Sequence, residues 1–192
     1  MIETHPFKAF VPENASVLIL GSFTSKKPNE NINYDFYYAN GRNQFWSIIE
    51  KVYNLSLDTT KKKQELFSKL GIAISDIIYQ CERKSNSSLD TNLVNFIYNF
   101  EAIEKILESK NIQRILFSSR FVEKEYKKIF KAQIKMYPKI ELITLPSPSP
   151  RYAILSKDEK GAIYAEILPK LVRNVHTTAS QEPPRTQLEP NV

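Results

Sequence analysis

Aromatic rings and amide groups are concentrated in one segment of the chain, Asp35–Trp46. Its rings are Phe36, Tyr37, Tyr38, Phe45 and Trp46, and the polar side chains among them include Asn40, Arg42 and Asn43. Proteins bind a flat heterocycle with such groups, by stacking on its face and hydrogen bonding at its edge. The same composition also fits a core segment whose amides cap a helix beginning near Asn43. Because Phe45 recurs with Ile48 at helical spacing, we expect Phe45 and Trp46 to pack rather than to contact a ligand.

A second segment that could do chemistry is the loop Gly21-Ser22-Phe23-Thr24-Ser25, which follows the apolar run Val17–Leu20. Small residues after a buried strand let the backbone approach a ligand and point N–H groups at developing negative charge. A tight turn from strand to loop would need the same residues. The loop matches neither a phosphate-binding P-loop nor a dinucleotide fingerprint.

Alternating prolines and serines form a third candidate segment, Leu145–Tyr152. The prolines fix the backbone dihedrals, and the serine hydroxyls remain available to bind phosphate oxygens. A rigid connector is the alternative interpretation.

Asp76 lies within the apolar run Gly71–Tyr79. A buried aspartate needs partners. It is either a catalytic or base-reading carboxylate, or a group that ties down nearby backbone amides.

These segments must be positioned by a regular framework. The predicted strands are 17–20, 71–79, 112–117 and 140–145, and the predicted helices are 43–52, 58–70, 100–107, 121–130 and 157–172, the last capped by Ser156. Such alternation predicts a parallel sheet covered on both faces. Ligands gather at the carboxyl ends of strands in these sheets, so we expect Gly21–Ser25, Ser118–Arg120 and Leu145–Tyr152 to meet there. We expect Arg83–Asn92 to be a loop.

Composition narrows the class of protein. With 192 residues and 42% hydrophobic content, we expect one domain over 1–173 followed by a disordered tail over 174–192. The net charge of +6 favours an anionic partner such as nucleic acid. Cys81 is the only cysteine and the histidines are His5 and His176, so we expect no disulfide and no metal. The sequence has no signal pattern and no bilayer-length apolar run, which predicts a cytoplasmic location and no membrane contact.

Three motifs in this order resemble the uracil-DNA glycosylase superfamily, and the hypoxanthine-DNA glycosylase branch most of all. They are Gly21-Ser22-Phe23, the aromatic block 36–46 ending in Arg-Asn-Gln-Phe-Trp, and Leu145-Pro-Ser-Pro-Ser-Pro150. The likeness spans residues 5–173. It implies an α/β fold, a three-layer αβα sandwich on a four-stranded, mainly parallel sheet. It also implies excision of a damaged or deaminated base from DNA, without metal or redox cofactor. We expect the protein to be a monomer.

The resemblance also implies roles for individual residues. Asn43 looks like the catalytic residue, an amide that orients a water, although helix capping would explain it equally. Tyr38 looks like the ring that stacks on the extruded base, and the backbone at Ser22 faces the carbonyl edge of that base. The predicted base pocket is Gly21, Ser22, Phe23, Tyr38, Asp76 and Ser118, and the predicted DNA contacts are Ser25, Arg42, Ser147, Ser149 and Arg151. Arg151 or Tyr152 would fill the gap left by the flipped nucleotide.

Two positions depart from the family pattern. The loop Gly21–Ser25 lacks the water-activating Asp or Asn that relatives often carry, and Ser118 stands where relatives often carry Asn-Gly. A bifunctional lyase needs a lysine amine that reaches the sugar, and the sequence singles none out, so we expect monofunctional excision of hypoxanthine and/or uracil. Two alternatives stay open. One is a DNA-binding protein that kept the fold without catalysis. The other is an enzyme acting on a free nucleoside, whose binding would not depend on salt.

Overall fold

The structure is a computed structural model that describes residues 2–24, 35–84 and 89–171. Predictions for Ser25 and for the tail 174–192 lie outside the described residues. No helix within these ranges is long and apolar enough to cross a membrane.

A four-stranded parallel sheet is the centre of the fold. Its order is β3 (Ile72–Asp76), β2 (Val17–Gly21), β6 (Arg114–Phe117) and β7 (Glu141–Thr144). The register pairs Gly21 with Asp76 and Leu20 with Phe117. Every residue of β2 and β3 is buried, as expected for strands covered on both faces. The predicted parallel sheet is confirmed.

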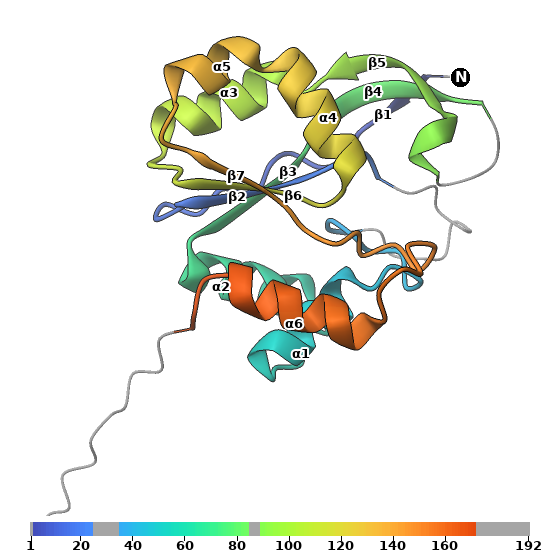
Figure 1. The fold of residues 1–192 in the computed structure, drawn as a ribbon, viewed down its shortest axis with the longest axis vertical. Coiled ribbons are helices and arrows are strands. Elements are labelled where there is room, and N and C mark those ends of the chain that lie inside the picture. Colours follow the sequence, from blue (N-terminus) through green and yellow to red (C-terminus); the bar gives the residue numbers. More distant parts are fainter. Residues whose placement is uncertain (1, 25–34, 85–88, 172–192) are drawn as a thin grey trace, which may run out of the picture.

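Helices cover both faces of this sheet (Figure 1). One layer holds α1 (Phe45–Tyr53), α2 (Thr60–Leu70) and α6 (Lys157–Ile167), and the other holds α3 (Phe100–Ser109), α4 (Arg120–Ile129) and α5 (Lys131–Met136). Side chains alternate along a strand, so Val17 and Ile19 pack with Ile48 of α1, whereas Leu18 and Leu20 pack with Ile103 of α3. The predicted αβα layers are therefore present. Phe45 and Trp46 are both buried, so their predicted packing role is confirmed.

A second, antiparallel sheet was not predicted. It joins β1 (Ile2–Thr4), β4 (Ile78–Arg83) and β5 (Leu93–Tyr98), with a short 3₁₀ helix, η1 (Asp90–Asn92), before β5. The single strand predicted over 71–79 is wrong: the chain bends at Ile77 and passes from one sheet to the other. The apolar run continues through this bend, so periodicity could not reveal the break. The predicted loop 83–92 is likewise shorter, because β4 runs to Arg83.

The helix ends differ from the prediction by a few residues. Helix α1 begins at Phe45 rather than Asn43. Ser156 and Glu159 form a reciprocal capping box at the start of α6, which confirms the predicted cap. Helix α6 ends at Ile167 instead of 172, because Leu168 precedes a proline and adopts an extended conformation.

Candidate functional site

A pocket of about 330 Å³ opens at the carboxyl ends of the parallel strands. This volume lies in the range in which proteins bind small molecules or parts of larger ones. The predicted site residues that line it are Ser22, Phe23, Tyr38, Arg42, Asn43, Asp76, Ser118, Ser147, Ser149 and Arg151. The three loops expected at this edge therefore meet in one place. Gly21 does not line the pocket itself, because two side chains lie over it.

Gly21 allows those two side chains to approach the end of β2. A Cβ atom built on Gly21 would stand 2.0 Å from Oδ1 of Asp76 and 2.8 Å from the hydroxyl oxygen of Tyr38. Neither distance is compatible with a real side chain at this position. The glycine is thus required by close approach, and it brings a carboxylate and a phenol together at the pocket.

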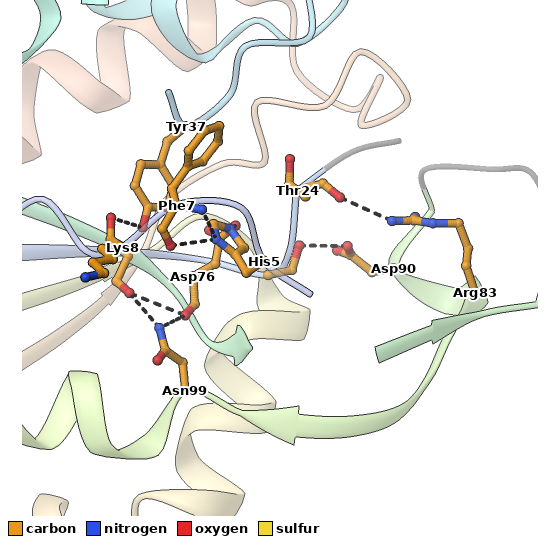
Figure 2. Close-up of polar contacts among 11 residues, drawn as sticks. His5, Phe7, Lys8, Thr24, Tyr37, Asp76, Arg83, Asp90 and Asn99 are labelled. Atoms are coloured by element: carbon orange, nitrogen blue, oxygen red, sulfur yellow. Dashed lines mark hydrogen bonds and ion pairs between the residues drawn. The ribbon is translucent and has the colours of Figure 1, made fainter. Parts of the chain in front are cut away.

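Asp76 is paired with His5, a residue for which no role was predicted (Figure 2). Nε2 of His5 lies 2.8 Å from Oδ2 of Asp76, and both side chains are buried. Nδ1 of His5 lies 3.0 Å from the Phe7 carbonyl oxygen. Burial lowers the pKa of His5, but the hydrogen bond and charge of Asp76, with the Phe7 carbonyl, outweigh burial and leave this pKa raised above 6.5. The expectation that a buried aspartate needs a partner is confirmed.

Tyr38 packs tightly against the start of α1. Its ring stacks on Phe45 with centroids 4.1 Å apart, and its backbone has a φ of 55°. One face of the Tyr38 ring is therefore already covered. The hydroxyl oxygen is buried and has no hydrogen-bond partner among the described residues. Burial and the nearby Asp76 carboxylate raise the pKa of Tyr38 well above 10, opposed by the neighbouring Ser118 hydroxyl.

A second carboxylate, Asp90, also lines the pocket. It begins η1, and its Oδ1 accepts a hydrogen bond of 2.7 Å from the Ser22 hydroxyl (Figure 2). Burial raises the pKa of Asp90; the hydrogen bond from Ser22 lowers it, the charge of Asp76 raises it and Arg83 lowers it, with a net rise. Asp90 thus belongs to the site, although the sequence suggested only a turn there.

The Asn43 side chain has a local structural contact. Its Oδ1 accepts a hydrogen bond of 2.9 Å from the Phe45 backbone N–H at the start of α1. Among the described residues, its Nδ2 has no hydrogen-bond partner. The contact holds the amide in place on the pocket wall, and Nδ2 remains able to donate into the pocket.

The proline–serine segment is held next to Asn43. The Pro148 carbonyl oxygen accepts from the Gln44 N–H at 2.9 Å. The Ser147 and Ser149 hydroxyls accept from the backbone N–H groups of Ser149 and Arg151 at 3.3 Å. These turns leave each hydroxyl proton free to donate, which suits a phosphate oxygen.

Lys160 of α6 binds the proline–serine segment through its ammonium group. Its side chain is only 1% exposed, and Nζ donates to Gln44 Oε1 at 2.9 Å and to the Ser149 carbonyl at 3.1 Å. Nζ also lies 5.4 Å from the centre of the Tyr152 ring. Burial lowers the pKa of Lys160, whose hydrogen-bond partners Gln44 and Ser149 are both neutral.

Three polar residues at or beside the site were not predicted from the sequence: His5, Asp90 and Lys160. His5 had one available signal, since a buried aspartate was predicted to need a partner. Asp90 and Lys160 had none, because an aspartate among turn formers and a lysine in a charged helix start are usually solvated. Within the parts of the chain that the structure describes, no group of three or more His, Cys, Asp or Glu side chains could hold a metal ion.

The chain is similar to proteins of known structure. No family model and no curated protein matches the chain. The solution NMR structure of a "putative Uracil DNA glycosylase" from Methanosarcina acetivorans matches with a TM-score of 0.61 at 24% sequence identity. The match covers 87% of this chain and 96% of that one. The two chains share a fold, and this agreement supports the predicted fold class.

Proposed function

We propose that this protein is a monofunctional DNA glycosylase that flips a deaminated base, hypoxanthine and/or uracil, out of DNA and hydrolyses its N-glycosidic bond. The observation that carries the proposal is the pocket itself, which combines hydrogen-bonding side chains inside with serines and arginines at its edge. A base must leave the stack to enter such a pocket. The shared fold of the Methanosarcina acetivorans protein supports the same class of reaction.

The edge of the pocket suits a DNA backbone. Ser147 and Ser149 have hydroxyl protons to donate, and Arg42 and Arg151 line the same opening. Guanidinium groups and hydroxyls are the usual partners of phosphate oxygens. In this proposal the proline–serine segment binds phosphates beside the flipped nucleotide, and Arg151 lies next to the gap in the duplex.

The interior of the pocket suits a base with a lactam N–H. A carboxylate accepts hydrogen bonds only, so Asp76 would accept the ring N–H of hypoxanthine or uracil. Adenine and cytosine carry an unprotonated ring nitrogen at that position, which would face the carboxylate lone pairs. Sites built on such a hydrogen bond reject the wrong analogue by on the order of 10⁴-fold or more. Asp76 would therefore separate a deaminated base from its parent.

Asn43 would orient the attacking water or the base through Nδ2. Its Oδ1 is held by the Phe45 N–H, so the amide is fixed before DNA binds. Fixed donors stabilise developing negative charge on the leaving base without reorganising during the reaction.

The test is base release from oligonucleotides that carry one uracil, hypoxanthine, xanthine or mismatched thymine, in single and double strands, with alkali to reveal abasic sites. Wild type, Asn43→Ala and Asn95→Gly would be compared. Asn95 is an exposed residue of β5 with a φ of 54° that glycine tolerates, so its replacement serves as the matched control. We expect release by wild type and the control, and loss in Asn43→Ala.

A non-catalytic DNA-binding protein is the second candidate, favoured by the capping contact of Asn43. It predicts no base release from any substrate and DNA binding that weakens steeply with salt. Release that survives Asn43→Ala would retain the enzyme but contradict the role of Asn43.

A further inference from the structure

Hydrolysis of an N-glycosidic bond is accelerated by a general base, a role that the amide of Asn43 does not fill. The attacking water must lose a proton, and the sugar passes through a positively charged, oxocarbenium-like state. An amide accepts no proton at neutral pH. A carboxylate can do both, because it takes the proton and its negative charge stabilises the sugar cation.

Two carboxylates of the described residues line the pocket, and they have different surroundings. Asp76 is buried against Gly21, and its Oδ2 is already paired with His5 Nε2 at 2.8 Å. Asp90 is half-buried, and among the described residues its side chain accepts one hydrogen bond, from the Ser22 hydroxyl to Oδ1. Asp90 lines the pocket, and its second carboxylate oxygen, Oδ2, is not the atom that the Ser22 hydroxyl holds.

The fold brings Asp90 to a specific place. Ser22 is the first residue after β2, the strand at the centre of the site, and the described part of the loop that follows contains no acidic side chain. Asp90 comes from the connection between β4 and β5 and reaches this loop from the side (Figure 2). A carboxylate from η1, before β5, thus lies beside a loop whose described residues carry none.

We propose that Asp90, held by Ser22, is the catalytic carboxylate of this site. This inference rests on the proposed glycosylase function and adds a residue to it. Oδ2 of Asp90 accepts a proton from water as the water oxygen bonds to C1′ of the sugar. The bond from C1′ to the base nitrogen breaks, and its electron pair leaves with the base, which then takes up a proton. The products are the free base and an abasic sugar, and the only co-reactant is water.

The surroundings of Asp90 suit a general base. Burial keeps its pKa above that of a solvated aspartate, and a base works best when its pKa lies closer to the working pH. The charged or titratable groups that face it are Asp76, Arg83 and Tyr38, and the same pocket is lined by His5, Arg42 and Arg151.

The test is single-turnover base release by wild type, Asp90→Asn and Asp90→Glu, on the best substrate of the panel above. Asp58→Asn, an exposed residue before α2, is the matched control. We expect Asp90→Asn to lose on the order of 10²- to 10⁴-fold in rate with unchanged DNA affinity and melting temperature. Asp90→Glu should recover part of the rate. A rate close to wild type in Asp90→Asn would overturn the inference.

The dependence of the rate on pH gives an independent readout. In wild type the rate should rise with pH through the pKa of Asp90, and this rise should vanish in Asp90→Asn. Ser22→Ala removes a hydrogen bond that lowers this pKa, so the rise should move to higher pH. An unmoved rise would contradict the inference even if Asp90→Asn failed to fold. If wild type released no base at all, the proposed function would fail first, and the inference with it.

Discussion

Asp76 and His5 form a buried ion pair. Their side chains are 8% and 3% exposed. Removing one member of such a pair leaves the other charge buried and unpaired, which costs about 3–5 kcal/mol. The lining of the pocket and the stability of the fold therefore depend on the same two residues.

Stability should therefore depend on pH through His5. Its pKa is raised in the folded state, so the pair stabilises fully below about pH 6.5, the unfolded value. This contribution is lost as pH rises through the folded pKa. Urea unfolding of wild type and His5→Gln across this range should give a difference in free energy that is largest at low pH and shrinks as pH increases. A difference independent of pH would contradict the charged pair.

Gly21→Ala should disturb the site through a single methyl group. The new Cβ would collide with Asp76 Oδ1, which must move away from its position beside Tyr38. We expect a loss of roughly 1–3 kcal/mol in unfolding free energy, typical of overpacking. Gly41→Ala is the control, because no heavy atom lies within 4 Å of the Cβ position there. Equal melting temperatures for the two variants would contradict the close approach.

At the scale of elements, α6 and the start of α1 fix the proline–serine segment together. Lys160 reaches from α6 to Gln44 and to Ser149, and the Gln44 N–H holds the Pro148 carbonyl. The segment that we assign to phosphate binding is thus anchored to two helices in the same layer. Its conformation is set before any ligand arrives.

Lys160→Met should weaken DNA binding without contacting DNA. Methionine keeps most of the side-chain volume but loses both hydrogen bonds of Nζ. Because burying an ammonium among neutral partners is itself costly, we expect little change in melting temperature and a clear loss of affinity. Lys157→Met removes an equal charge from an exposed position of α6. Equal affinities for the two variants, measured by titration of a labelled oligonucleotide, would show that Lys160 does not position the segment.

The helices and strands also show which parts of the fold could be predicted from the sequence. The strand Val17–Gly21 is uniformly apolar and ends at a glycine, so the local pattern identified it. The candidate functional residues follow the ends of predicted strands. Because ligands bind at the carboxyl ends of strands in a parallel sheet, the meeting of these loops was predicted correctly. The antiparallel sheet was missed because β1 has only three residues and β4 continues an apolar run. His5 and Asp90 depend on contacts between distant segments, which no local pattern encodes.

Over the whole molecule, the net charge and the arginines at the pocket both suit binding of a polyanion. The chain carries a net charge of +6, and the pocket with its arginines opens at the carboxyl edge of the sheet. Long-range attraction of this kind is weak at any one residue but adds up for a polyanion. In the proposed function, DNA would therefore bind across the carboxyl ends of the parallel strands, where the pocket opens.

The salt dependence of DNA binding should reveal the electrostatic contribution to affinity. The logarithm of the DNA association constant should fall linearly with the logarithm of salt concentration, and Arg42→Ala or Arg151→Ala should each reduce the slope by about 1. Lys139→Ala is the matched control, since this exposed residue precedes β7 at the opposite edge of the sheet. A slope equally changed by Lys139→Ala would contradict the assigned surface.

The placement of His5 directly after β1 has one more consequence. β1 is a three-residue edge strand that pairs only with β4 in its sheet. Short edge strands open at much lower free energy than the core, so amide protons there exchange with solvent by local opening. Each such opening would withdraw His5 from Asp76 while the parallel sheet stayed intact. On warming, the pocket would thus lose its charge pair before the molecule unfolds, and activity would decline at a lower temperature than the main melting transition.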